Sequence, residues 1–554
     1  MDREFCVIAY AGDRFARRVV IALATAVLVA FGFAGSGAAA DGAVATTFRW
    51  GVEADAASLD PYTRNETVQL ALTGNIYEPL IRRSASLSLE PALALSWEST
   101  TPTTWRFHLR PGVKWQDGSA FTAADVLFSL RRVQSPSSLL RSVVSGIAGA
   151  TQVDDLTVDF QTAAPDPILP QEISVWYIMS KAWAERNGAT DPALLATGGE
   201  NFATRHAMGT GPFRLTLREQ DQRTVLERNP SWWDTTSAVV DRAEMVVLGN
   251  ATTRVAALLS GEVDLITAVP PQDADYIGGS DGLKLIVGPE LRTIFLGMDQ
   301  SRDELLTSDV KGRNPFKDPR VREAMALAID ETAIVAKVMR GRARPTWLLW
   351  GPGVSGYNAA LDHRPAPDPE HARALLADAG YPHGFSVRLD CPNDRYMMDE
   401  AICTALVPML ARIGVRVQLA TQPKARFFAD IGPPAYRTSF YLLGWSPPTY
   451  DAHDVLLNLA AKRDGARGAI NYGGFADPGL DALIDRIGRE GDARAREGLL
   501  SQAAEMLQRS WAYIPLHQQM LVWGAKADVD VPQTADGRLQ LRLVRSGHEI
   551  STRQ

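Results

Sequence analysis

Helical and extended patterns alternate along the second half of the chain, and this alternation limits the folds that the chain can adopt. Residues 318–329 start with Asp-Pro, a typical beginning for a helix, and carry an apolar stripe. A helix at 368–380, a strand at 385–390, a helix at 399–413 and a strand at 415–419 are predicted after it. Such alternation favours an α/β fold with a mainly parallel sheet.

Residues 89–217 follow a different pattern, one that is richer in hairpins. Residues 104–115 alternate apolar and polar side chains and then turn at Pro111–Gly112. At about 150 residues per domain, 554 residues are enough for more than one hydrophobic core. We therefore expect two or three lobes. An eight-fold β/α barrel is the main alternative, but it requires regular alternation from the start of the chain, and the hairpins interrupt that alternation.

The N-terminus has the features of a secretory signal peptide. Arginines at positions 14, 17 and 18 precede an apolar run over 19–33, and small residues follow up to Ala40. The run is shorter than the roughly 20 residues that cross a bilayer, so an uncleaved membrane anchor is the less favoured alternative. We expect residues 1–40 to be removed and the mature protein to be periplasmic, starting at Asp41.

Composition excludes several classes of protein. Apolar residues make up 46% and charged residues 22%, which is ordinary for a globular protein. The net charge is −7, and no lysine- or arginine-rich block stands out. Nucleic acid and anionic membranes are therefore not expected as partners.

Three cysteines are too few for a disulfide-rich scaffold or a four-cysteine zinc site. Cys6 lies in the predicted signal peptide. Cys391 and Cys403 remain, and in an oxidising compartment they form either a disulfide or two buried free thiols.

Sequence motifs for catalysis and for cofactors are weak. Residues 278–282 (GGSDG) match the Gly-x-Ser-x-Gly nucleophile elbow, but that elbow needs a strand before it and a helix after it. A strand-like segment follows here, so we interpret the match as a surface turn. Asp451, His453 and Asp454 could bind a metal or a metal chelate, although a single histidine is a thin ligand set and a solvated loop is the favoured interpretation. We expect no resident metal, no cofactor and no catalytic residues.

Many ordered segments resemble the bacterial extracellular solute-binding proteins of family 5, the peptide/nickel-type receptors of ABC importers. The resemblance covers nearly all of residues 46–525. It rests on the number and order of the matching segments, which include SLDPY (58–62), IYEPLI (76–81), EPALALSWE (90–98), TWRFHLRPGVKWQDGSAFTAADVLFSLRR (104–132), GTGPFRL (209–215), ERNPSWW (227–233), RVAALLSGEVDLI (254–266), DPRVREAMALAID (318–330), ARALLADAGYPHGF (372–385), GW (444–445) and IPLH (514–517).

The resemblance implies a two-lobe periplasmic-binding-protein fold of the large type II variant. Two hinge strands would join the lobes, and the solute would be held between them. The first lobe would consist of residues 41–88, 209–290 and 521–554. An extra subdomain would take residues 89–208, and the second lobe residues 291–520.

The resemblance also suggests which residues line the cleft. Trp445 would offer a flat apolar wall, Tyr450 a wall with a hydroxyl, and Asp451 an anchor for a cationic group. The alternatives are packing between the lobes for the tryptophan and solvated surface for the charged residues. The full set that we expect at the ligand is Trp445, Ser446, Tyr450 and Asp451 from the second lobe, with Arg64, Asn65 and Glu66 from the first.

Two positions argue against a free linear peptide as ligand. Peptide-binding relatives carry an aspartate three residues after the tryptophan, which holds the peptide ammonium, and oligopeptide binders often carry an arginine three residues before it. Here these positions are Pro448 and Leu442. A buried ammonium or carboxylate without a partner is unfavourable. We therefore expect unmodified di- and tripeptides to bind poorly, and a ligand that is blocked, cyclic, sugar-like or cationic.

The sequence is thus interpreted as the periplasmic substrate-binding component of an ABC importer. It would capture a peptide or peptide-like solute, act as a monomer, and deliver the solute to permease subunits in the inner membrane. The alternatives are a receptor for a metal chelate, an oligosaccharide or an opine-like compound, a chaperone-like binder of unfolded segments, and a secreted hydrolase.

Overall fold

The computed structural model describes residues 46–195, 198–234, 240–465 and 467–546. The chain divides into a unit that ends at Val44 and a compact unit that starts at Ala45, and the fold below is that of the second unit. The predicted signal peptide lies outside the described residues. Within these residues, no helix combines the length and the apolar character that crossing a membrane requires.

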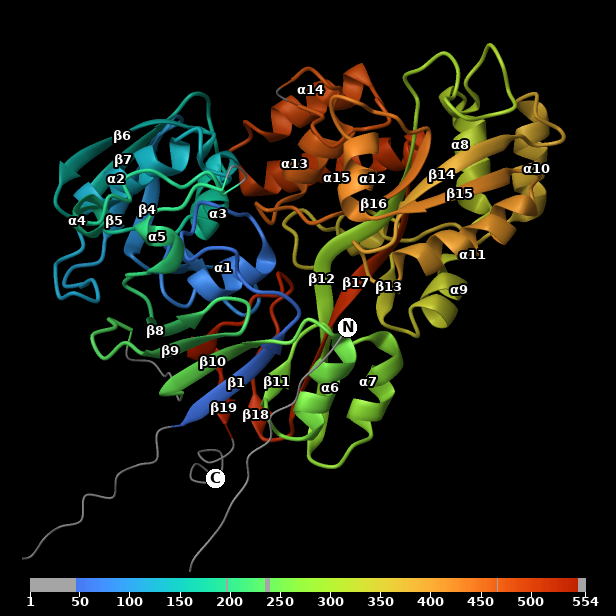
Figure 1. The fold of residues 1–554 in the computed structure, drawn as a ribbon. Helices are drawn as coiled ribbons and strands as arrows, with labels where there is room; N and C mark the ends of the chain where they lie inside the picture. Colours follow the sequence, from blue (N-terminus) through green and yellow to red (C-terminus); the bar gives the residue numbers. More distant parts are fainter. Residues whose placement is uncertain (1–45, 196–197, 235–239, 466, 547–554) are drawn as a thin grey trace, which may run out of the picture. The chain divides into compact units, whose positions relative to one another are not determined.

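An eleven-stranded mixed sheet organises the compact unit (Figure 1). Ten strands follow the order β15-β14-β16-β12-β17-β11-β1-β10-β9-β8, and β13 pairs with β17 beside this path. The bounds of these strands are β1 Thr47–Val52, β8 Phe213–Glu219, β9 Arg223–Arg228, β10 Arg242–Val247, β11 Leu265–Ile266, β12 Leu283–Met298, β13 Ala343–Pro345, β14 Ser386–Pro392, β15 Arg416–Gln422, β16 Phe440–Trp445 and β17 Tyr513–Lys526.

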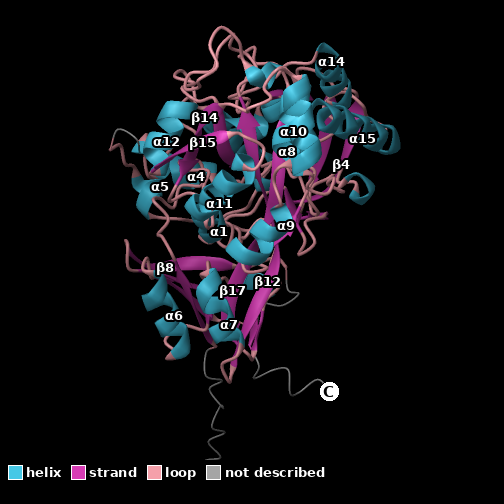
Figure 2. Cartoon of the chain, turned by 90° about the vertical axis from the view of Figure 1, so that its right-hand side faces the viewer, coloured by secondary structure: helices cyan, strands magenta, loops and turns pink. Residues whose placement is uncertain are grey.

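Strands β12 and β17 are long and antiparallel, and they belong to both halves of this sheet (Figure 2). Their pairing shifts register between Pro289 and Thr293. On the Met298 side of that shift, β12 pairs with β16 of one half. On the Leu283 side of the shift, β17 pairs with β11 of the other half. These two strands are the hinge of a two-lobe fold.

The second-lobe half of the sheet has the predicted α/β character. Strands β14 and β15 are parallel, and β14 is also parallel to β16. Helix α8 (Pro319–Leu327) begins as expected, because the Asp318 side chain accepts a hydrogen bond from the backbone N–H of Arg320. Helices α10 (Pro369–Asp378) and α11 (Asp399–Ala411) complete the predicted alternation, and their apolar faces contribute to one core.

A separate four-stranded antiparallel sheet accounts for the hairpin-rich region. Its order is β4 (Ala94–Thr101), β5 (Thr104–Leu109), β7 (Thr157–Thr162), β6 (Ile147–Asp154). Helix α2 (Ala123–Gln134) starts with a capping box formed by Thr122 and Asp125. All of these elements fall inside residues 89–208.

The remaining elements include two small two-stranded sheets, β2-β3 and β18-β19. Segment 278–282 follows helix α7 and precedes strand β12, which is the reverse of the strand–turn–helix order of a nucleophile elbow. The helices are α1 Thr67–Thr73, α3 Leu169–Glu172, α4 Lys181–Arg186, α5 Phe202–Arg205, α6 Ala251–Leu259, α7 Pro271–Gly278, α9 Glu331–Ala333, α12 Lys424–Ile431, α13 Ala452–Val455, α14 Pro478–Ile487 and α15 Ala493–Ser510, and the short strands are β2 Ile81–Arg83, β3 Leu89–Pro91, β18 Val529–Asp530 and β19 Arg545–Ser546.

Candidate functional site

The segment after strand β16 contains four of the expected ligand residues. Strand β16 ends at Trp445, and Pro447 and Pro448 follow, which have no N–H with which to extend a ladder. Tyr450 has a φ of 59°, and Asp451 caps the short helix α13. Trp445 and Ser446 are half-buried.

Asp451 does not fit the expected role of an anchor for a ligand cation. Its side chain is fully buried, and its two oxygens accept hydrogen bonds from the Arg496 guanidinium at 2.7 and 2.8 Å. One of these oxygens also accepts from the backbone N–H of His453 at 2.8 Å. Arg496 lies on α15, far along the chain, so sequence patterns gave no sign of this pair. The carboxylate is already neutralised inside the protein and has no free edge for a solute.

The other two members of the predicted acidic and histidine group also have partners within the fold. The His453 ring donates from Nε2 to the carbonyl of Ile484 at 3.1 Å, and burial lowers the pKa of this ring. Asp454 accepts from the Trp445 indole N–H at 3.0 Å. Burial raises the pKa of Asp454 to about 7, although that indole hydrogen bond opposes the shift. No metal-binding group of three or more such residues occurs in the described ranges.

Tyr450 contacts residues that lie far from it in the sequence. Its hydroxyl donates to Asp536 at 2.8 Å, and the Arg83 guanidinium lies 4.0 Å from its ring centroid. Arg83 also donates to the carbonyl of Thr449 at 3.3 Å. Burial raises the pKa of the Tyr450 hydroxyl. Tyr450 therefore joins the segment after β16 to strand β2 and to Asp536, and part of it lines a cavity.

The expected first-lobe residues lie at the start of helix α1. Asn65 and Glu66 are exposed and Arg64 is half-buried, with Glu66 at the N-cap position. Within the described ranges, no ion pair or side-chain hydrogen bond joins these three residues to the segment after β16. Their role as ligand residues stays a prediction.

The side chain of Leu442 points into the core, so it does not contact a ligand in the cleft. It is fully buried in the core of the second lobe, whereas the next residue, Leu443, packs into the larger core on the opposite face of the strand. The comparison of Leu442 with a ligand-binding arginine therefore gives no information about the charge of the site. The cations near the tryptophan come from other elements.

Arg292 and Arg395 are these cations, and sequence reasoning missed both. The Cδ atom of Arg292 lies 3.1 Å from where a Cβ on Gly444 would stand, which places this side chain directly against the end of β16. Arg292 pairs with Glu290 at 2.7 Å. Burial raises the pKa of Glu290, and the nearby charges of Arg292 and Arg395 partly offset that effect. Two guanidinium groups thus lie near a single carboxylate.

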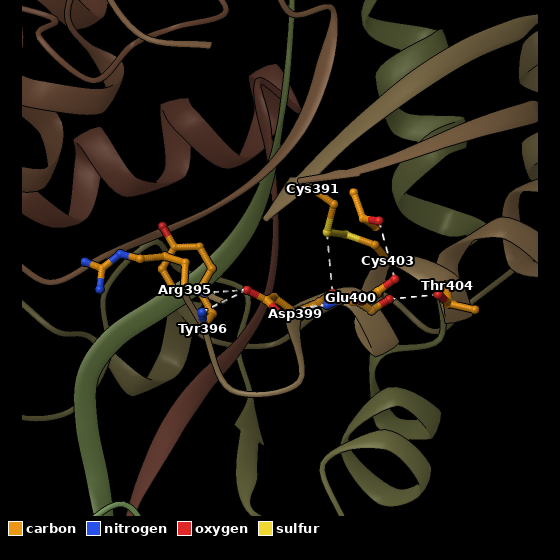
Figure 3. Close-up of a disulfide and its surroundings, with 8 residues drawn as sticks. Cys391, Arg395, Tyr396, Asp399, Glu400, Cys403 and Thr404 are labelled. Atoms are coloured by element: carbon orange, nitrogen blue, oxygen red, sulfur yellow. Dashed lines mark hydrogen bonds between the residues drawn. A yellow bond between two sulfur atoms is a disulfide. The ribbon is translucent and has the colours of Figure 1, made fainter. Parts of the chain in front are cut away.

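Arg395 lies in the loop between β14 and α11, which a disulfide and several hydrogen bonds stabilise (Figure 3). The Cys391–Cys403 disulfide joins the end of β14 to α11. The Asp399 carboxylate accepts from the backbone N–H groups of Arg395 and Tyr396 at 2.9 and 3.0 Å. The Tyr396 hydroxyl donates to the carbonyl of Gly444 at 3.3 Å. Arg395 itself is exposed, and its guanidinium extends away from the disulfide.

One family model matches most of the chain, and a curated relative matches over a similar length. The model of the bacterial extracellular solute-binding proteins, family 5, matches residues 88–467, more than half of the chain. The chain is 26% identical to the glutathione-binding protein GsiB of Pectobacterium atrosepticum over 472 residues, which cover 84% of this chain and 87% of the relative.

Solved structures show the same fold. HbpA2 of Haemophilus parasuis superposes with a TM-score of 0.77 at 24% identity and covers 90% of this chain and 99% of its own. The periplasmic binding protein DppA of Helicobacter pylori, in complex with the peptide STSA, gives a TM-score of 0.72 at 23% identity and covers 90% and 98%. The two lobes, the hinge strands and the family match lead to one conclusion: the chain is a member of family 5 of the bacterial extracellular solute-binding proteins.

Proposed function

We propose that this protein is the periplasmic receptor of an ABC importer and that it binds a peptide or peptide-like solute by a carboxylate. The observation that carries the proposal is the pair Arg292 and Arg395 beside the end of β16, with Glu290 as their shared acid. An exposed guanidinium in a pre-organised loop is well suited to a bidentate contact with a carboxylate. Trp445 would provide the apolar wall next to it.

The sequence predicted that the site lacks partners for both the carboxylate and the ammonium of a peptide. This proposal changes the expectation for the carboxylate and keeps the expectation for the ammonium. A carboxylate partner is available, although not at position 442. The position three residues after Trp445 is still a proline, and Asp451 is occupied by Arg496, so no carboxylate is offered there to a ligand ammonium. The solute is thus expected to depend strongly on its carboxylate and weakly on its amine. The relatives named for glutathione and for peptide binding support a solute of this size and type.

The wider role follows from the family. The receptor would be released after cleavage near Ala40, act as a monomer, close on its solute and dock on the permease subunits of the importer. It carries out no reaction in this proposal. Closure is favoured because the solute contacts both lobes only in the closed state.

Titration calorimetry tests the carboxylate. The probes are glutathione and one tripeptide, the tripeptide also as its C-terminal amide and its N-acetyl derivative. We expect the amide to bind about tenfold or more weakly, as the loss of a charge-assisted hydrogen bond does, and the N-acetyl form to bind nearly as well as the free peptide. Arg395→Gln should weaken the free peptide and not the amide. Arg373→Gln, on the exposed side of α10, is the matched control.

Equal binding of the acid and the amide would refute the carboxylate contact. Loss of binding on N-acetylation alone would show an ammonium anchor that the proposal lacks. Binding of a nickel–histidine chelate or an opine, with no response to any of these peptides, would favour the other solute classes.

A further inference from the structure

A second group of arginines surrounds a cavity in the first lobe. The cavity has a volume of about 80 Å³ and lies between helix α1, strand β2 and the segment 536–542, with Tyr450 of the second lobe in its wall. This space holds several waters or one small polar group, but not a peptide. Its charged lining residues are Arg82, Arg83, Arg538 and Arg542 with Glu78 and Asp536.

Two of these four arginines have a carboxylate partner. Arg82 pairs with Asp234 at 2.8 Å and with Glu90 at 3.3 Å. Arg538 lies 3.6 Å from Asp536.

Arg83 and Arg542 donate to neutral groups. Arg83 donates to the Ser174 hydroxyl and to the carbonyls of Leu87, Gln171 and Thr449. Arg542 donates to the Gln540 side chain at 2.8 Å and to the carbonyl of Arg83 at 3.4 Å. Neither forms an ion pair with a carboxylate within the ranges that the structure describes.

Glu78, the other acid in the cavity lining, does not balance these two cations. Glu78 accepts hydrogen bonds from the indole N–H groups of Trp232 and Trp233 at 3.1 and 2.9 Å. Burial raises its pKa, which reduces its negative charge. The cavity wall therefore carries more positive than negative charge, and a buried cation without a counterion is unfavourable.

We propose that this cavity is a binding site for a small oxyanion, a carboxylate or phosphate group, held between Arg83 and Arg542. The Arg542 guanidinium contacts the backbone carbonyl of Arg83, and both residues line the same small space. Burial lowers the pKa of each guanidinium to about 10, and the charges of nearby carboxylates offset that effect only in part. A bound oxyanion would supply that charge through charge-assisted hydrogen bonds.

The site is connected to the segment after β16. Arg83 stacks on Tyr450 and donates to Thr449, so an anion on Arg83 would lie next to this contact. This inference does not depend on which solute the cleft takes. The anion is either a free ion or an acidic group of the transported solute, and the chemistry of the cavity is the same for both.

Thermal unfolding and calorimetry of the full mature protein test the site. Inorganic phosphate and acetate are the probes, and sodium chloride at matched ionic strength is the reference. The variants are Arg542→Gln, which removes the charge, Arg542→Lys, which keeps it, and Arg494→Gln on the exposed surface of α15 as control. Wild type and Arg494→Gln should be stabilised by phosphate or acetate beyond the effect of chloride. Arg542→Gln should bind the anion about tenfold or more weakly, with partial recovery in Arg542→Lys.

A second titration, with the tripeptide and its amide, distinguishes a free anion from an acidic group of the solute. Free-anion binding that depends on Arg542, with peptide affinity unchanged in Arg542→Gln, identifies a separate anion. Dependence of the free peptide on Arg542, absent for the amide, identifies an acidic group of the solute. If Arg542→Gln alters neither the response to phosphate and acetate nor the binding of the peptide, the cavity is not an anion site. That result would leave the proposed role of Arg395 untouched.

Discussion

Asp451 and Arg496 form a charge pair at a depth where neither side chain is hydrated, so the loss of one partner leaves the other buried and uncompensated. Asp451→Asn should lower the free energy of unfolding by about 3–5 kcal/mol, measured by urea denaturation. Glu505→Gln is the control, because Glu505 and Arg509 form an exposed pair of the same chemistry, which contributes at most about 1 kcal/mol. A stable Asp451→Asn protein that no longer binds its solute would restore the ligand role that the structure argues against.

Asp454 should make stability depend on pH. Its pKa is raised to about 7 in the folded protein by burial, whereas an unfolded aspartate titrates near its usual value of about 4. Between these values the folded state holds a proton that the unfolded state has lost, so stability falls as the pH rises through this range. His517 acts in the opposite direction, since burial lowers its pKa to about 4.

The contribution of Asp454 to the pH dependence of stability is therefore measured as the difference between wild type and a variant without this carboxyl group. Melting temperatures of wild type and Asp454→Asn are compared from pH 4.5 to 8. The wild type should lose more stability than the variant as the pH rises to about 7, because the variant cannot release this proton. If the melting temperatures of the two proteins change with pH in parallel, the pKa of Asp454 is not raised.

Sequence patterns placed Trp445, Tyr450 and Asp451 in one segment, but they could not give the partners of these residues. Arg496 is 45 positions from Asp451, and Arg292 reaches Gly444 only because β12 and β16 pair in a particular register. Capping and periodicity are local properties, whereas these contacts depend on the packing of distant elements. The direction of Leu442 also follows from the strand that contains it, and a motif comparison does not include that information.

At the scale of elements, the loop between β14 and α11 is the part that the disulfide stabilises most directly. Replacing both cysteines, Cys391→Ala with Cys403→Ala, should lower the free energy of unfolding by about 3 kcal/mol, the loop-closure value for a short loop. Urea denaturation with and without a reductant measures this. The reductant should destabilise the wild type and leave the double variant unchanged. A wild type that is insensitive to a reductant under unfolding conditions would contradict the bond.

Elements with strong local signals were predicted well. The Asp-Pro start of α8 and the strands β14 and β15 occur where their residues indicated. The length of β12 was not predicted, because only its first residues have a clear strand pattern. The rest of β12 includes glycine and proline and is held by its neighbours β16 and β17.

At the scale of the whole molecule, closure around the hinge strands should be measurable. Small-angle scattering is expected to show a smaller radius of gyration when a binding peptide is present at saturation, because the solute favours the closed state. Arg395→Gln at the same peptide concentration should keep the larger value, which separates closure from effects of the peptide on the solvent. Binding by calorimetry without any change in the radius of gyration would argue against the hinge mechanism.

The pairing of β11 with β17 also determines when the chain can finish folding. Strand β1 pairs with β10 and β11, and all three strands are synthesised before β17. The other edge of β11 pairs with β17, which is synthesised near the end of the chain. The first half of the sheet therefore keeps an unpaired edge while residues 267–512 are made. Contacts of such long sequence separation slow folding. A nascent chain of this design stays without its complete sheet until its last strand has emerged, a property that is compatible with being threaded unfolded through a secretion channel.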